Sequence, residues 1–96
     1  MAAYLIYARN EITDEEVSRR YSELAVPQIR EFGGEVLIAR GAVHPLEGDL
    51  SPRFVTILRF EDREALMRWY DSPEYAPLKQ MRLDSNIGDM IVVDPA

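Results

Sequence analysis

Two side chains in the segment 44–52 could exchange protons with a small molecule near neutral pH. His44 is the only histidine of the chain, and the unperturbed pKa of an imidazole suits it to general base catalysis. Glu47 follows three residues later and could orient the imidazole, because carboxylates and imidazoles commonly pair. A lone histidine in a loop is more often simply solvated. We therefore name His44 and Glu47 as candidate catalytic residues, with a solvated loop as the alternative.

Arginine side chains near the ends of apolar segments could hold an anion. Arg40, Arg59 and Arg82 each need a counterion, because a buried unpaired charge is costly. One guanidinium fork could bind the carboxylate or enolate of a small ligand and stabilise negative charge that develops on it. The structural alternative is a salt bridge with one of several acidic residues: Glu47, Asp62, Glu64 or Asp84. Of the three arginines, we assign Arg40 and Arg82 to a ligand pocket.

The heptapeptide "WYDSPEY", residues 69–75, gathers three aromatic rings. Trp69 lies at helical spacing from Leu66, which favours a core position over a ligand platform. The hydroxyl of Tyr75 needs a hydrogen-bond partner, and a ligand in a pocket would supply one as readily as the core. Together with Tyr7 from an N-terminal strand, Trp69 and Tyr75 complete the expected pocket.

The first half of the chain predicts a strand, a helix and a second strand. "YLIYAR" (4–9) is short and apolar, which is typical of a strand. Thr13 with Glu16 forms a capping box, so we expect a helix from there to about Phe32. Pro27 lies inside this helix and predicts a kink or a break near residues 23–26. The Gly33-Gly34 pair supplies the stop, and "EVLIARGAV" (35–43) follows as a strand.

The second half predicts two more strands and two more helices. "RFVTILRF" (53–60) is a strand that follows a long hairpin connection rich in proline and glycine. Asp62, or Glu61 before it, can cap a helix that ends near residue 71. Ser72 then caps a short last helix with Pro73 in its first position, and "DMIVV" (89–93) is the last strand. The order β-α-β-β-α-β predicts one ferredoxin-like α+β domain over residues 1–96, an antiparallel four-stranded sheet with its helices on one face.

Alternate residues of each strand point to opposite faces of the sheet, and here both sets are mostly apolar. This affects how we expect the protein to assemble. Two helical segments cover one face of such a sheet, so the other face of a monomer should be polar. An exposed face this apolar would exceed the contiguous patch that soluble monomers usually carry. We therefore expect a homodimer formed through the helix-free sheet faces, a dimeric α/β barrel.

The composition limits which partners and cofactors we expect the protein to bind. The formal charge of −6 opposes binding to nucleic acid or to anionic lipid. The chain has no cysteine, which fits a cytoplasmic location. The N-terminus lacks the features of a signal peptide, and no apolar run is long enough to span a membrane. With a single histidine and no thiolate, we predict no metal site and no cofactor.

Several of these segments resemble a known family. "GGEVLIARG", "LEG" (46–48), "RFVTILRF", and above all "WYDSPEY" followed by Arg82, are similar to the domain of unknown function 1330 family of the dimeric α/β barrel superfamily. The resemblance covers nearly the whole chain and implies the fold, the dimer and no settled reaction. Arg59 departs from the family pattern, which has an acidic residue at that place, so the preferred ligand charge here can differ from that of relatives.

Two functions are compatible with these observations. The first is the binding or transformation of a small apolar or aromatic carbonyl compound without metal or flavin, as in the cofactor-free oxygenases and isomerases of the wider superfamily. The second is a non-catalytic binding or stress-associated dimer with no open active site. Fold alone does not separate them.

Overall fold

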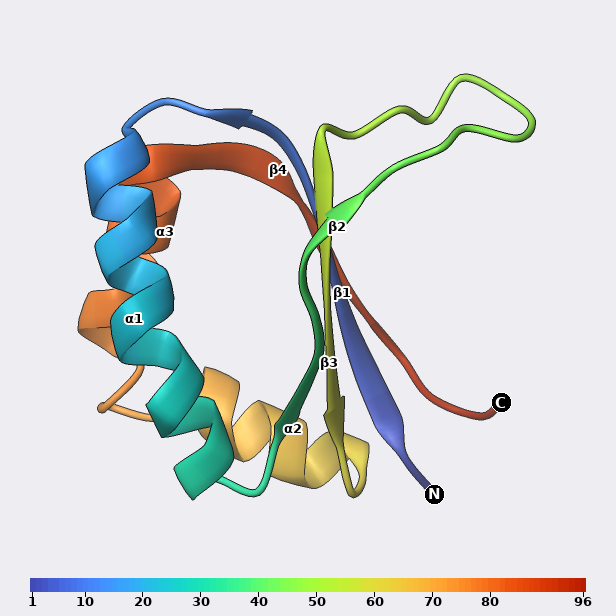
Figure 1. Ribbon diagram of the computed structural model, residues 1–96. Coiled ribbons are helices and arrows are strands. Elements are labelled where there is room, and N and C mark those ends of the chain that lie inside the picture. The colour runs from blue at the N-terminus through green and yellow to red at the C-terminus, as the bar shows by residue number, and fades with distance from the viewer.

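The computed structural model describes residues 1–96 as a single sheet with a layer of helices (Figure 1). In chain order its elements are β1 (Ala3–Ile12), α1 (Glu15–Glu31), β2 (Glu35–Ala42), β3 (Phe54–Phe60), α2 (Arg63–Tyr70), α3 (Ala76–Ser85) and β4 (Asn86–Val93). This is the predicted ferredoxin-like order, with the last helical segment separate from α2. The N-terminal and C-terminal strands are longer than the sequence indicated.

Helix α1 begins at a side-chain cap. Asp14 has an extended backbone, and its carboxylate accepts a hydrogen bond from the Val17 backbone N–H at 3.1 Å. The predicted cap, Thr13, is therefore wrong by one residue. The Thr13 hydroxyl instead donates to the Asp84 backbone carbonyl at 3.4 Å, which ties the start of α1 to the end of α3.

The same helix continues to Glu31 with Pro27 inside it, so the break predicted near residues 23–26 is wrong, while the alternative, a kink, stays a prediction. A proline removes one backbone N–H, and the intact turns on either side keep the helix whole. The stop is as predicted: Gly33 has a φ of 87°, a left-handed conformation that glycine adopts without steric cost.

The corner at residues 69–75 joins α2 to α3. Asp62 caps α2 as predicted, by accepting from the Ala65 backbone N–H at 2.8 Å. The Ser72 hydroxyl accepts from the Tyr75 N–H at 3.1 Å and donates to the Trp69 carbonyl at 2.7 Å. Ser72 therefore caps a turn, and α3 starts only at Ala76.

The strands form one four-stranded sheet in the order β2-β3-β1-β4, and every neighbouring pair is antiparallel. Strands β1 and β3 are central, and the register pairs Tyr7 with Thr56 on β3 and with Met90 on β4. A bulge lies between Arg9 and Glu11 where β1 pairs with β4. Beyond it both strands bend toward the helices (Figure 1).

The helices lie on one side of the sheet, so the sheet has a covered face and a free face (Figure 1). The hydrophobic core fills the covered side, where Trp69, Tyr75, Phe60 and Leu66 are almost completely buried. On the free face the strands carry apolar side chains, as predicted: Ile38 and Ile91 remain 45% and 55% exposed, beside Ile6 and Ile57 of the central strands.

The connection between β2 and β3, residues 43–53, projects away from the helical layer, and both chain termini lie at the opposite end of the sheet (Figure 1). Leu46 at its tip is 93% exposed. None of the helices combines the length and the apolar character that crossing a membrane requires.

Candidate functional site

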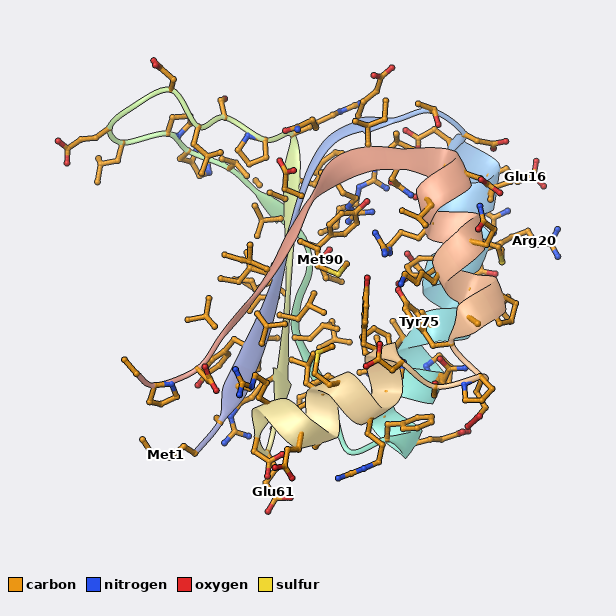
Figure 2. All side chains as sticks on the ribbon, turned by 180° about the vertical axis from the view of Figure 1, so that it is seen from behind. Met1, Glu16, Arg20, Glu61, Tyr75 and Met90 are labelled. Carbon is orange, nitrogen blue, oxygen red and sulfur yellow. The ribbon has the colours of Figure 1, made fainter.

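A cavity of about 60 Å³ lies between α1 and the covered face of the sheet. Most of its wall is apolar: 11 of the 15 lining residues are hydrophobic. Figure 2 shows Met90 on the sheet and Tyr75 on the helical side, both directed to the space between the two layers. An apolar cavity with a few converging polar groups is the usual form of a small-molecule site. Its polar groups come from Tyr7, Arg9, Tyr21, Ser22, Thr56 and Asn86.

Beside the cavity, Tyr21, Tyr75 and Arg82 form one hydrogen-bonded chain. The two hydroxyl oxygens are 2.8 Å apart, and Arg82 Nε donates to the Tyr75 hydroxyl at 3.2 Å. The three side chains come from α1, the corner before α3, and α3 itself. Packing holds the rings in place, because Tyr75 is fully buried against Trp69, with ring centroids 4.2 Å apart.

The hydrogen-bond partners of each group determine which atom donates in this hydrogen-bonded chain. Arg82 can only donate, so the Tyr75 oxygen accepts from it. A buried Tyr75 proton without an acceptor would be costly, and Tyr21 is the one acceptor in reach. The Tyr75 proton therefore points to Tyr21, and the proton of Tyr21, which lines the cavity, is free for a ligand.

Arg82 is a buried cation without a carboxylate partner. Its side chain is 5% exposed, and none of the ion pairs of the chain includes it. Burial lowers the pKa of Arg82, but the tyrosine hydroxyls around it raise that pKa above its ordinary value, so the group is a permanent cation. Burial, reinforced by Tyr75, raises the pKa of Tyr21 well above its usual range, which keeps that hydroxyl protonated at neutral pH.

Beneath these groups Asn86 makes a satisfied polar contact between α1, α3 and β4. Its Oδ1 accepts from the Ser18 hydroxyl at 3.2 Å, and its Nδ2 donates to the Arg82 carbonyl and to Ser85 Oγ. All of these groups are buried. We infer that this network positions Arg82, because it fixes the turn of α3 that carries this residue.

Four of the predicted pocket residues come together here. Tyr7 and Trp69 line the cavity, and Tyr75 and Arg82 stand directly behind Tyr21. Arg82 also packs over Tyr7, with its guanidinium carbon 5.1 Å from the ring centroid. Trp69 belongs equally to the core, since it stacks on Phe60 at 5.8 Å.

The other predicted site residues lie elsewhere. Arg40 is exposed at the edge of a polar vestibule outside the cavity, 3.8 Å from a Glu15 carboxylate oxygen and over the Phe54 ring. His44 and Glu47 are exposed on the projecting segment 43–53 and line neither the cavity nor the vestibule. Their acid–base role stays a prediction. Arg59 has a salt bridge, which was the structural alternative, but its partner is none of the four acids that we named: it is Glu35 on the neighbouring strand, at 2.8 Å.

Two residues of the site were not among the predicted ones. Tyr21 lies within the helix predicted from Thr13 to about Phe32, and Arg9 is the last residue of the strand predicted at 4–9, but neither was named as a site residue. A signal was present in both cases: a tyrosine at the centre of a buried helical stripe needs a partner for its hydroxyl. Arg9 alternates with Leu5 and Tyr7, so it must share their face.

Metal-binding groups do not gather in the structure: no three His, Asp or Glu side chains lie close enough to hold an ion. The cavity wall likewise contains no carboxylate and no imidazole. The site has a mostly apolar wall that contains the hydroxyl groups of Tyr7 and Tyr21, with the cation of Arg82 behind them. This arrangement suits the binding of an oxygen atom that carries negative charge.

The antiparallel β-α-β-β-α-α-β arrangement with a cavity under its helices defines a small ferredoxin-like α+β protein. Within that class, the chain belongs to the family described as domain of unknown function (DUF1330), whose model matches residues 2–96. The resemblance noted in the sequence is thereby confirmed. No curated protein is similar enough in sequence to count as a relative.

Known structures share the fold at low sequence identity. RPA0582, a protein of unknown function from Rhodopseudomonas palustris, superposes with a TM-score of 0.72 at 18% identity, over 99% of this chain and 82% of that one. Rv0793 from Mycobacterium tuberculosis gives 0.65 at 15% identity, over 100% and 96% of the two chains. SnoaB, a cofactor-independent oxygenase from Streptomyces nogalater, gives 0.61 at 13% identity, over 99% and 92%. At these identities the similarity establishes the fold alone.

Proposed function

We propose that this protein binds a small, largely apolar carbonyl compound in the cavity between α1 and the sheet, and stabilises negative charge on its oxygen without metal or flavin. The observation that carries the proposal is the buried Arg82, which has no carboxylate partner and donates to Tyr75. A ligand oxygen that accepts from Tyr21 would lie at the end of a chain of donors that starts at a cation. Charge that develops there, as in an enolate, is stabilised by preorganised dipoles.

The size of the cavity restricts the ligand. A cavity of roughly 150 Å³ accommodates benzene, whereas this one measures about 60 Å³. Only a very short compound fits the cavity as it stands, and a longer chain or an aromatic ring requires a neighbouring side chain to move. Met90 at the cavity wall is the residue best suited to that movement, because an unbranched thioether changes rotamer easily.

Assembly as a homodimer is part of the proposal. The free face of the sheet carries Ile38 and Ile91, both about half exposed, next to Ile6 and Ile57. A second copy packed on this face would remove the apolar patch from water at a gain of about 25 cal/mol per Å². The projecting segment 43–53 carries exposed leucines, Leu46 and Leu50, which a partner copy would also shelter.

An acid–base step would need a group from outside the cavity wall. His44 and Glu47 remain our candidates, and because they lie on the projecting segment, their participation requires the loop to approach a cavity in the assembled protein. If a His44→Gln variant retained full turnover of an identified substrate, the pair would be removed from the mechanism.

A second function, binding without catalysis, is favoured by one observation. Tyr75 is fully buried and already satisfied by Tyr21 and Arg82, and the cavity wall offers no base. Such a protein would sequester or carry the same ligand. The two functions share one site and differ in whether the bound compound is converted.

The test is ligand binding by wild-type protein and two variants. Small ketones and carboxylates are screened by thermal shift, since a ligand at 100 times its Kd adds about 2.7 kcal/mol of stability. Tyr21→Phe removes the free hydroxyl proton and should raise the Kd of a ketone about 2-fold to 10-fold. The Kd of an enolate analogue should rise by a larger factor, because hydrogen bonds to charged groups are stronger.

The matched control is Arg59→Gln, which changes an exposed arginine at a strand position outside the cavity wall. It should leave every Kd unchanged. No shift with any compound, on wild-type protein shown to be folded by circular dichroism, would contradict the proposal. Incubation of the best ligand with protein, followed by mass spectrometry of the small molecule, separates conversion from simple binding.

A further inference from the structure

Arg9 is a second buried cation, and the Tyr21–Tyr75–Arg82 chain does not use it. Its side chain is 7% exposed, and its Nη2 donates to two neutral groups, the Ala39 carbonyl at 3.2 Å and Thr56 Oγ1 at 3.1 Å. It takes part in no ion pair, and its Nε is buried with no partner at all. The guanidinium of Arg9 therefore faces neutral oxygen atoms and the rings of Tyr7 and Phe54, 5.7 and 5.9 Å from its central carbon, but no carboxylate within ion-pair distance.

The two hydrogen bonds of Arg9 do not explain its presence. Thr56 Oγ1 donates to the Ala39 carbonyl at 2.7 Å, so these two groups satisfy each other without the guanidinium. An apolar side chain of similar volume would fill the same space without an unpaired charge, a replacement that is often neutral or stabilising. A cation kept in such a place indicates an anionic partner that binds there.

The position of Arg9 defines where that anion would bind. Arg9, Ser22 and Ala39 line both the apolar cavity and the polar vestibule outside it, so Arg9 stands at the neck between them. Two acids of the vestibule, Glu15 and Glu16, oppose anions at the outer rim, and Glu15 lies next to Arg40. Arg19 also lines the vestibule and pairs with Glu23, so Arg9 at the neck is the vestibule arginine that has no ion pair.

Arg9 and Arg82 approach the same aromatic ring. Their guanidinium carbons lie 5.7 and 5.1 Å from the Tyr7 ring centroid, so they are no farther apart than the sum of these two distances. A short molecule that carries two oxygen functions spans such a separation. The apolar lining of the cavity accepts its alkyl chain.

We propose that the ligand is a short-chain oxo carboxylate, with its carboxylate on Arg9 at the neck and its carbonyl oxygen on the free proton of Tyr21. This rests on the proposed function, which supplies the carbonyl end, and adds the anionic end and the residue that recognises it. A monoanion with an alkyl chain matches one free guanidinium at a narrow opening and a small apolar space behind it.

Three matched compounds test the assignment. 2-Oxopentanoate carries both groups, 2-pentanone lacks the carboxylate, and pentanoate lacks the carbonyl. Calorimetric titration of wild-type protein should give a Kd for 2-oxopentanoate at least about 10-fold below that for 2-pentanone, because a hydrogen bond between two charged groups is roughly twice as strong as a neutral one. In Arg9→Gln this ratio should fall to about 1 while the Kd of 2-pentanone stays unchanged.

Tyr21→Phe provides the reciprocal comparison. It should reduce the preference for 2-oxopentanoate over pentanoate and leave the preference over 2-pentanone intact. Without ligand, Arg9→Met should melt at the same temperature as wild type or higher, since it removes an unpaired buried charge. A clear fall in melting temperature would indicate that Arg9 serves the fold.

Each outcome decides a separate point. If wild-type protein binds 2-pentanone as tightly as 2-oxopentanoate, or if Arg9→Gln weakens all three compounds equally, the Arg9 assignment is overturned and the proposed function stands. If folded wild-type protein binds none of the three, both are overturned. The comparison of compounds on wild-type protein holds even if no Arg9 variant folds.

Discussion

Arg9 and Arg82 differ from the surface arginines of this protein in lying inside it without an acidic neighbour. The arginines in ion pairs are at least partly solvated and contribute little to stability; they are Arg19, Arg40, Arg59 and Arg63. A net charge of −6 provides ample carboxylates for pairing, yet none lies within ion-pair distance of Arg9 or Arg82. That selective absence is why these two residues, of all the cations, indicate a binding site.

Tyr21 gives a pH-dependent prediction at the same scale. Its pKa is raised by burial and by Tyr75, so the folded protein keeps this proton while the unfolded chain loses it near pH 10. The folded state then binds more protons, and the free energy of unfolding falls as pH rises from about 10 toward the folded pKa. This residue alone contributes a slope of as much as about 1.4 kcal/mol per pH unit, and below pH 10 its contribution is fully present.

Urea unfolding at pH 9 and at pH 11 measures the effect. Tyr21→Phe should lose less stability than wild type between the two values. Tyr4→Phe, a change on the free face of the sheet, is the matched control and should follow the wild-type curve. An identical loss in wild type and Tyr21→Phe would show that the Tyr21 hydroxyl is not held in its neutral form.

At the scale of elements, the site depends on where β1 and β4 bend toward the helices. Gly88 pairs with Arg9 across this bend, and β4 passes so close to β1 that a side chain on Gly88 has no room. A Cβ there would lie 2.9 Å from Arg9 Cα and closer still to the Ala8 carbonyl oxygen. Because both neighbours are backbone, they cannot rotate away.

Gly88→Ala should therefore move β4 or lengthen its hydrogen bonds to β1, at a cost of about 1 to 3 kcal/mol. Equilibrium unfolding in urea measures this loss, and ligand binding should weaken as well because Arg9 lies at the contact. The control is Asp89→Ala, an exposed position next to it, where a change within about 0.5 kcal/mol is expected. Wild-type stability in Gly88→Ala would mean that the bend is more plastic than the structure indicates.

The helical corner at residues 69–75 is the other element that positions the site. Ser72 caps the turn, which fixes Tyr75 between Trp69 and Tyr21. The turn then delivers Arg82 two helical turns later onto the Tyr75 hydroxyl. Residues 69–75 therefore have a structural role, and that role is to place Tyr75 where it bonds to both Tyr21 and Arg82.

At the scale of the whole molecule, the free face of the sheet is the feature that supports the proposed dimer. Four isoleucines lie across its strands: Ile6, Ile38, Ile57 and Ile91. Their side chains give the sheet an apolar surface that the helices of the same chain leave uncovered (Figure 1). A domain of 96 residues buries a modest share of its surface by itself, so association adds substantially to its stability.

Ile91→Glu should convert a dimer into a monomer, because each interface would then bury a carboxylate facing its symmetry mate. Sedimentation velocity at micromolar protein measures the change in mass. Leu83→Glu, which alters a similarly exposed leucine on α3, is the control and should leave the mass unchanged. A wild-type protein that sediments as a monomer at every concentration would remove the dimer from the proposed function.

Much of the fold was predictable because its signals are local. Asp62 as a cap, the Gly33 stop and the order of apolar segments depend on a few adjacent residues, and the structure confirms them. The errors were local as well. Asp14 caps α1 in place of the predicted Thr13, and Pro27 does not break that helix.

The candidate site was predictable in part. Tyr7, Trp69, Tyr75 and Arg82 were chosen from apolar segments, and in the structure they lie at or directly behind the cavity; their role in binding stays a prediction. The pairing of Tyr21 with Tyr75 spans 54 positions of sequence, and no local pattern indicates it.

The sequence by itself determined the type and order of the elements and an apolar excess on both faces of the sheet. Only the tertiary structure decided which charges lack a partner. Compensation of a buried guanidinium depends on what distant segments bring within about 4 Å of it. Arg59 meets Glu35 on the next strand, whereas Arg9 and Arg82 meet neutral oxygen atoms and an aromatic ring.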